Sequence, residues 1–191
     1  MTDIITMPML LKRNADRLGN TRVAIREKEF GIWQPVTWKG YFENVRDFAL
    51  GLHQLGFKRE DKFAYAGDNR PEGLYSELVV QALGGAIVGI YPDSHLDQVE
   101  YIINHSDSIF VVAGDQEQAD KLLDIKDKCP HIIKIIVDDP KGMRRYNEPI
   151  LAYFRDIQNL GRELHEKEPR LFDEMIAAVQ PHDVGMINYT S

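Results

Sequence analysis

The sequence ends in residues whose side chains could bind phosphate. Its last six residues read MINYTS, an apolar run followed by Tyr189, Thr190 and Ser191. Hydroxyl groups at the carboxyl end of a strand can contact phosphate oxygens, and the backbone N–H groups of such a turn can add further donors. The same residues could simply close a turn, and spacing alone favours that second interpretation.

Other residues that could carry chemistry lack the context that it requires. Gly84, Gly85 and Gly89 follow a predicted helix and precede a strand. A dinucleotide-binding glycine motif must instead follow a strand and open a helix, so these glycines indicate tight helix-to-strand packing. The six histidines lie in no zinc-binding pattern, and no Gly-x-Ser-x-Gly elbow is present. Cys129, the only cysteine, precedes a proline at a predicted helix end, which favours a structural thiol. We therefore expect no metal site among these residues.

The elements that must position the terminal hydroxyls form a regular alternation. From residue 62 to residue 138, apolar strands alternate with amphipathic helices in the order β-α-β-α-β-α-β. This order predicts an α/β fold with a parallel sheet and helices on both of its faces. Ligands bind such sheets outside the carboxyl ends of the strands. The predicted strand ends are Gly67-Asp68-Asn69, Tyr91-Pro92-Asp93-Ser94, Gly114-Asp115 and Asp138-Asp139.

Helix starts and strand limits follow from capping residues and apolar runs. Short strand-like runs at residues 23–28 and 34–37 predict an N-terminal β-hairpin, after which Thr37 caps a long helix. The other predicted starts are Asn69 with Pro71, Ser94 with Asp97, and Asp115 with Gln118. The predicted strands are 63–66, 86–91, 109–113, 132–137 and a final strand over 185–189.

The chain divides into three predicted parts. Residues 1–139 form the parallel α/β subdomain together with the N-terminal hairpin and helix. Residues 140–182 are highly charged and carry two helical patterns, so they are interpreted as a helical connection. Residues 183–191 carry the final predicted strand and are expected to begin a further subdomain.

Composition restricts the class of protein. The chain has 191 residues, 43% of them hydrophobic, and a net charge of −7, which argues against a nucleic-acid-binding surface. The longest apolar stretch is interrupted by glycines and is shorter than the roughly 20 residues that span a bilayer. A single cysteine suits a reducing compartment, so a cytoplasmic location is expected, and peripheral membrane contact stays open.

Five stretches, taken in order, resemble the start of one enzyme family. They are VTWKGYFENVRDFALGLHQLGF, GDNRPEG, GGAIVGIYPDS, VEYIINHSDSIFVVAGD and PHDVGMINYTS. Together they are similar to the AMP-forming acyl-CoA synthetases of the adenylate-forming superfamily, and most of all to long-chain fatty acid–CoA ligases. The terminal YTS resembles the opening of that family's phosphate loop, which continues Gly-Thr-Thr-Gly.

The resemblance implies a reaction in two steps and gives roles to particular residues. A fatty carboxylate attacks the α-phosphate of ATP to form acyl-AMP and pyrophosphate, and the thiol of coenzyme A then displaces AMP. Thr190 and Ser191 would contact the ATP phosphates, whose charge Mg²⁺ partly neutralises, and Tyr189 would support the loop. Tyr91 and Ser94 would lie on the coenzyme A side.

The same resemblance implies that most of the catalytic machinery lies outside these residues, so we expect no catalytic residue within them. We therefore expect an N-terminal portion of such a ligase that is inactive alone and that self-associates through its last strand. Two alternatives remain open. The chain could be a complete flavodoxin-like module that binds a nucleotide or regulates a partner. It could also be a non-catalytic truncated paralogue that acts as a subunit.

Overall fold

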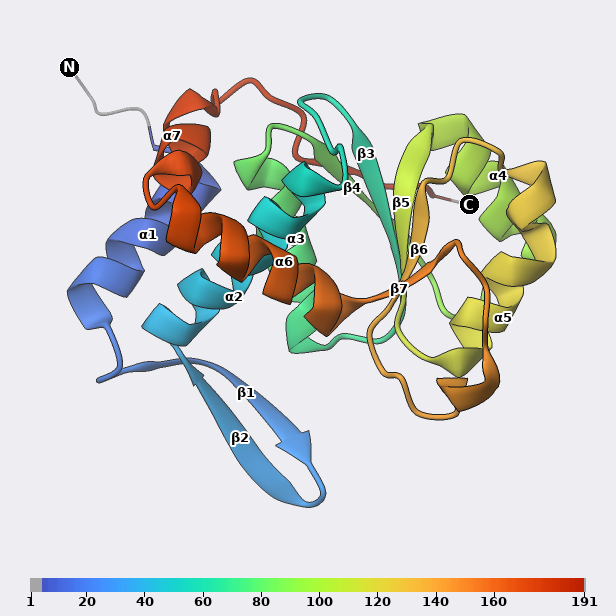
Figure 1. Cartoon of the computed structure of the whole chain (residues 1–191), viewed down its shortest axis with the longest axis horizontal. Coiled ribbons are helices and arrows are strands. Elements are labelled where there is room, and N and C mark those ends of the chain that lie inside the picture. Colours follow the sequence, from blue (N-terminus) through green and yellow to red (C-terminus); the bar gives the residue numbers. More distant parts are fainter. Residues whose placement is uncertain (1–4, 191) are drawn as a thin grey trace.

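A six-stranded sheet forms the centre of this computed structural model, which describes residues 5–190 (Figure 1). The strand order is β7-β6-β5-β3-β4-β8, and every neighbouring pair is parallel, as predicted. The strands are β3 (Lys62–Ala66), β4 (Ala86–Ile90), β5 (Ser108–Ala113), β6 (Lys134–Val137), β7 (Leu151–Tyr153) and β8 (Met186–Ile187).

Helices cover both faces of the sheet, so the predicted α/β class is confirmed. One face carries α1 (Met7–Leu18), α2 (Trp38–Gln54), α3 (Pro71–Ala82), α6 (Phe154–Lys167) and α7 (Leu171–Ala178). The other face carries α4 (Leu96–Ser106) and α5 (Gln116–Ile125). Because side chains alternate along a strand, β3 buries Phe63 against the first set of helices and Ala64 against the second. Strands β3, β4, β5 and β6 thus each contribute buried side chains to two separate cores.

The N-terminal hairpin is confirmed and projects from the sheet unit (Figure 1). Its strands are β1 (Val23–Glu29) and β2 (Ile32–Thr37), paired antiparallel. Phe30 and Gly31 both have positive φ, as the tight turn between these strands requires. The predicted cap at Thr37 is also confirmed, since its hydroxyl oxygen accepts a hydrogen bond from the Gly40 N–H at 3.0 Å.

Among the other predicted helix starts, one is confirmed and two are wrong. Asp115 caps α5 by accepting from the Gln118 N–H at 3.0 Å. Asn69 does not cap α3, because the preceding position is Arg70 and Pro71 supplies the first helical residue. The start predicted at Ser94 with Asp97 lies one residue too early, because His95 is the N-cap of α4. Instead, the Gln98 side chain accepts from the His95 N–H at 3.1 Å.

Several strand and helix limits differ from the prediction. Strand β6 begins at Lys134 rather than at residue 132, and β8 covers only Met186 and Ile187. Helix α1 was not predicted from the sequence at all. Residues 140–182 contain α6 and α7, but also β7, which extends the sheet beside β6. This segment therefore adds an edge strand as well as helices, while the proposed division of the chain into three parts stays a prediction.

Two glycines allow α6 to lie directly on α2. A Cβ atom added at Gly161 would fall within contact distance of the Asp47 carbonyl oxygen and 2.7 Å from the Gly51 nitrogen. One added at Gly51 would lie 2.6 Å from Ile157 Cγ2. Beside this crossing, Arg162 Nε of α6 donates to Asp47 Oδ2 of α2 at 3.2 Å. The two helix backbones are therefore too close for any side chain at either glycine.

Two further expectations from the sequence concern packing. Close packing is confirmed at Gly85, where an added Cβ atom would lie 2.7 Å from the Phe57 ring, and is wrong at Gly89, where an added Cβ atom would meet nothing within 4 Å. Cys129 is a free thiol, 1% exposed, in the core between the sheet and α5. Burial raises the pKa of the thiol, which disfavours the reactive thiolate.

Candidate functional site

A groove of about 1000 Å³ runs between the hairpin and the carboxyl ends of β3, β4 and β8. The hairpin side includes Arg26, Lys28 and Trp33, while the sheet side includes Tyr91 and Thr190. Since the sheet is parallel, its strands all present their carboxyl ends at this edge. The groove therefore lies where the sequence predicted a ligand, and the hairpin supplies a wall that the sequence did not predict.

The structure brings together some of the predicted site residues. Tyr91, Tyr189 and Thr190 line the groove, and Tyr91 is 79% exposed, so its ring is free to meet a ligand. Ser94 is half-buried and is not among the groove residues. Ser191 lies outside the described residues. The roles assigned to all five residues stay predictions.

The turn that carries Tyr91 is held by helix α5. The Ser94 N–H donates to the Tyr91 carbonyl oxygen at 3.0 Å and closes a turn. The Pro92 carbonyl oxygen accepts from Lys121 Nζ at 2.6 Å and from Gln118 Nε2 at 3.2 Å. Two donors from one helix fix this turn, so Tyr91 stands at a defined position on the rim of the groove.

Tyr189 is held by helix α4, which covers the same face of the sheet as α5. Its hydroxyl group lies 2.7 Å from Nδ1 of His105, within hydrogen-bond distance. The Tyr189 ring meets the His105 ring edge-on, with 5.6 Å between centroids and an interplanar angle of 83°. Thr190, the next residue, is exposed on the groove rim.

A partly buried charge cluster lies at the same edge of the sheet and was not predicted. Arg70, just before α3, is surrounded by carboxylates of the hairpin, of α3 and of the residues after β6. Its Nε atom lies 3.4 Å from Asp138 Oδ2, 3.6 Å from Glu27 Oε1 and 3.8 Å from Glu72 Oε2. Its Nη1 atom lies 4.0 Å from Asp139 Oδ2. We refer to these five residues as the Arg70 cluster.

Several polar atoms of the Arg70 cluster lack hydrogen-bond partners. Arg70 Nε, Glu72 Oε2 and Asp138 Oδ2 are buried without a hydrogen-bond partner. Burial, followed by the neighbouring Glu72 carboxylate, raises the pKa of Asp138 to about 7, against the opposing effect of Arg70. Burial also raises the pKa of Glu72. The cluster therefore holds more carboxylates than one guanidinium group can neutralise.

Sequence reasoning found one part of this site and missed another. The strand ends at Tyr91 and Asp138 were predicted as a ligand edge, and both lie there. The hairpin wall with Trp33 was missed, because no local pattern links residue 33 to residue 190. Arg70 was interpreted only as part of a helix start. Its position between several carboxylates depends on pairs up to 69 residues apart in sequence, such as Arg70 with Asp139.

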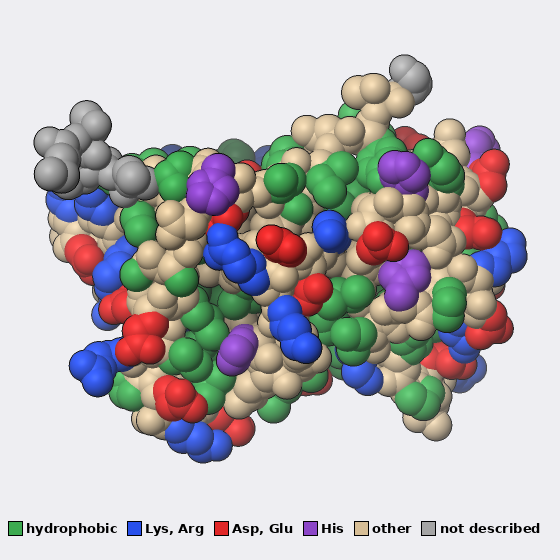
Figure 2. Space-filling model, turned by 90° about the horizontal axis from the view of Figure 1, so that it is seen from above, with side chains coloured by type: hydrophobic (Ala, Val, Ile, Leu, Met, Phe, Trp, Pro, Cys, Tyr) green, Lys and Arg blue, Asp and Glu red, His purple; other side chains and the backbone are tan. Residues whose placement is uncertain are grey.

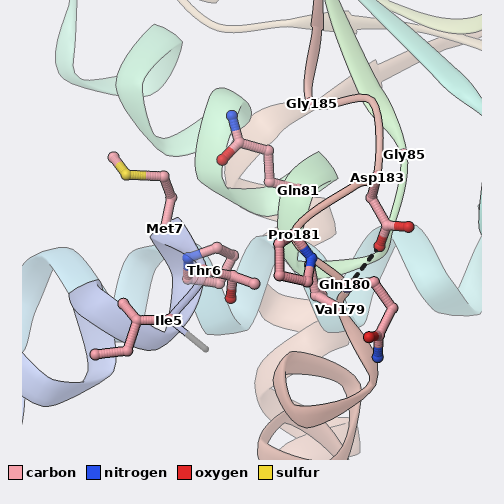
Figure 3. Close-up of a pocket in the computed structure, with 11 residues that line it drawn as sticks. Ile5, Thr6, Met7, Gln81, Gly85, Val179, Gln180, Pro181, Asp183 and Gly185 are labelled. Atoms are coloured by element: carbon pink, nitrogen blue, oxygen red, sulfur yellow. Dashed lines mark hydrogen bonds between the residues drawn. The ribbon is translucent and has the colours of Figure 1, made fainter. Parts of the chain in front are cut away.

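A second, smaller cavity lies at the opposite edge of the sheet (Figure 3). It has a volume of about 250 Å³ and is lined by Thr6, Gln81, Gly85, Gln180 and Gly185, among others. Gly85 and Gly185 precede β4 and β8, so this cavity lies at the amino ends of those strands. It is therefore separate from the groove.

The surface and the donor set limit which ligands these residues could hold alone. On the face shown in Figure 2, acidic and basic side chains are intermingled rather than separated into one basic field. Within residues 5–190, no group of three or more His, Cys, Asp or Glu side chains is placed to hold a metal ion. We therefore assign none of these side chains to Mg²⁺. Of the helices in the described part of the chain, none is long and apolar enough to cross a membrane.

Comparison with known proteins gives consistent results. The sequence model of the family described as AMP-binding enzyme matches residues 11–191. The long-chain-fatty-acid–CoA ligase ACSBG2 of Xenopus laevis is 25% identical over 187 residues, which cover 98% of this chain and 24% of that protein. The 4-hydroxybutyrate–CoA ligase 2 of Metallosphaera sedula is 35% identical over 138 residues, or 71% of this chain and 24% of that protein.

Solved structures show the same fold. The anthranilate CoA ligase AuaEII, in complex with anthranoyl-AMP, superimposes with a TM-score of 0.71 and 18% sequence identity. The match covers 83% of this chain and 29% of that protein. The chain thus spans about a quarter of the length of the curated relatives that it matches.

Proposed function

This chain belongs to the AMP-binding enzyme family, and we propose that it is the N-terminal part of an AMP-forming acyl-CoA ligase that acts on long-chain fatty acids. The observation that carries this proposal is the groove at the carboxyl ends of the strands. There Thr190 and Tyr91 share one rim. Helix α5 holds the turn that carries Tyr91, and helix α4 contacts Tyr189, the residue before Thr190. The long-chain substrate is supported by the relatives of the fatty-acid-ligase class that match almost the whole chain.

In this proposal the chain binds and orients, while other parts of the ligase complete the chemistry. The Thr190 hydroxyl and the backbone around it would meet the phosphates of ATP, with Ser191 continuing the turn and Tyr189 holding it. Small hydroxyl residues suit this place because they let backbone N–H groups approach the phosphate oxygens. Mg²⁺ would neutralise phosphate charge, held by the phosphates and by residues outside the described part. Tyr91, and Ser94 in its turn, would face coenzyme A.

The complete ligase would perform two displacements. The carboxylate oxygen of the fatty acid attacks the α-phosphorus of ATP, forming acyl-AMP as pyrophosphate leaves. The sulfur of coenzyme A then attacks the acyl carbon, and AMP leaves as the thioester forms. A cytoplasmic setting, with or without contact to a membrane surface, suits these substrates.

The proposal predicts that the isolated chain is inactive and that the complete ligase depends on Thr190. The full reading frame should catalyse ATP–pyrophosphate exchange with long-chain carboxylates, whereas purified residues 1–191 should match a mock preparation. Replacing Thr190 with valine in the complete enzyme should lower kcat for exchange by about 10²-fold, the usual effect of losing one donor to developing phosphate charge.

The matched control is Thr21→Val, because Thr21 is remote from the groove and its hydroxyl donates to the Leu18 carbonyl oxygen at 2.6 Å. Equal rates for the two variants would remove the phosphate role from Thr190. Exchange by residues 1–191 above the mock preparation would overturn the predicted inactivity. A stop codon after Ser191 together with nucleotide affinity would favour the stand-alone module, and co-purification with a full-length ligase would favour the subunit.

A further inference from the structure

Strand β8 alone does little to place the residues that follow it. Its pairing with β4 consists of Ile87 with Met186 and Val88 with Ile187. As the last strand in the sheet order, β8 has β4 as its one neighbour within the described residues. The position of residues 188–190 must therefore depend on side-chain contacts made beyond the ladder.

Helix α4 offers such a contact on its last turns. Tyr101 and His105 lie four residues apart, so they share one face of the helix, and their rings stack with 5.2 Å between centroids at 27°. The Tyr189 ring stands edge-on to both, at 6.3 Å and 85° to Tyr101 and at 5.6 Å and 83° to His105. Edge-to-face contact with two stacked rings gives Tyr189 a defined orientation.

The hydrogen bond adds a directional contact to this packing. The Tyr189 hydroxyl lies 2.7 Å from His105 Nδ1, which can accept from the phenol or donate to it according to its proton. In both protonation states of the imidazole one partner can donate, so the contact does not depend on ionisation of His105. Burial raises the pKa of Tyr189, which keeps the phenol protonated and able to donate.

We propose that Tyr101 and His105 form a notch that positions Tyr189, and that His105 is thereby a positioning residue for the phosphate-binding turn at Thr190. The second half of this proposal rests on the proposed function, and the first half does not. His105 is not among the residues that line the groove, and its ring contacts Tyr101 and Tyr189. Its effect on a nucleotide would pass entirely through Tyr189.

The anchoring can be tested by hydrogen exchange on purified residues 1–191. His105→Ala should accelerate amide exchange in β8 by about tenfold, because losing one hydrogen bond and one aromatic contact at Tyr189 lets the end of β8 separate from β4 more often. Exchange in β5 and α5 should stay unchanged, which separates loss of the notch from general unfolding. The matched control is His53→Ala, since His53 is exposed near the end of α2.

Further variants divide the two contacts. Tyr189→Phe keeps the ring and removes the hydroxyl, whereas His105→Phe keeps a stacked ring and removes the nitrogen. Each should give a smaller acceleration than His105→Ala. The double variant Tyr189→Phe/His105→Phe should exchange no faster than either single variant, because both substitutions remove the same hydrogen bond. His105→Asn should restore part of the protection by returning a polar partner. Unchanged exchange in both His105→Ala and Tyr189→Phe would overturn the anchoring.

The functional half has its own measurement in the complete ligase. His105→Ala should raise KM for ATP in pyrophosphate exchange while leaving KM for coenzyme A unchanged, and His53→Ala should change neither. If hydrogen exchange shows that His105→Ala removes the anchoring while KM for ATP is unaffected, His105 positions Tyr189 without serving ATP binding. The second half of the proposal is then wrong. If the ligase shows no exchange with any carboxylate, the proposed function fails, and hydrogen exchange still decides the anchoring.

Discussion

Replacing Gly161 with alanine is expected to destabilise the fold by about 3 kcal/mol, at the upper end of the cost of overpacking a core. Helix propensity alone predicts the opposite sign, because alanine favours an α-helix over glycine by about 1 kcal/mol. The added methyl group has no room, because it would overlap the Asp47 carbonyl oxygen on α2. Relief requires α6 to move off α2, which would open the core around Phe48 and Phe154, whose rings stack at 3.8 Å.

Urea denaturation of the unsubstituted chain and of Gly161→Ala measures this difference in the free energy of unfolding. In a thermal melt the substitution should lower Tm by roughly 6–12 °C. The control is Gly89→Ala in β4, where an added Cβ atom has nothing within 4 Å. That variant should be neutral or slightly stabilising, since glycine in a strand costs about 0.5–1 kcal/mol relative to alanine. A Gly161→Ala chain as stable as the control would mean that α6 does not rest on α2 at this crossing.

Replacing Asp138 with asparagine is expected to stabilise the chain above neutral pH and to remove a pH dependence. The pKa of Asp138 is raised from 3.8 to about 7 in the folded chain. The folded state therefore retains a proton that the unfolded state releases, and the free energy of unfolding falls as pH rises between these two values. At about 1.4 kcal/mol for each pKa unit, this loss is about 4 kcal/mol in total, and about 2–3 kcal/mol of it lies between pH 5 and pH 8.

An asparagine side chain carries no charge at either pH, so the variant should lose less stability than the unsubstituted chain between pH 5 and pH 8. Urea titrations at both values give the four free energies needed. Asp139→Asn is the control, because this carboxylate is 39% exposed and lies at the edge of the Arg70 cluster. If Asp138→Asn keeps the original difference between the two pH values, the burial of an ionisable carboxyl group beside Glu72 is not what makes the cluster pH-sensitive.

The sheet could be predicted from the sequence because its signal is local. Runs such as Phe63-Ala64-Tyr65-Ala66 are apolar on both faces, which only a strand covered on two sides requires. Helix α1 was missed although Pro8 lies in its first turn and Gly19 follows its end, both of which are ordinary helix limits. Strand β7 was missed because three residues carry too short a pattern to separate a strand from the first turn of α6.

The site was predictable only where one stretch of sequence carries it. Thr190, in MINYTS, lines the groove at the carboxyl ends of the strands, and the resemblance to acyl-CoA synthetases agrees with the family match. The helix starts at Asn69 and Ser94 failed because several residues near each start can cap, and local packing selects one of them. The Arg70 cluster and the notch on α4 were beyond prediction, since each joins elements whose proximity is set by the order of the strands.

The reactivity of Cys129 can report how often the core around it opens. As the single thiol, 1% exposed, it is shielded from solvent, and its raised pKa keeps it protonated. An aromatic disulfide reagent can therefore react only during moments when the region between α5 and β6 opens. The rate at which this one sulfur becomes labelled should equal the frequency of those openings at high reagent concentration. The labelling rate would therefore measure local opening of this core without an engineered cysteine.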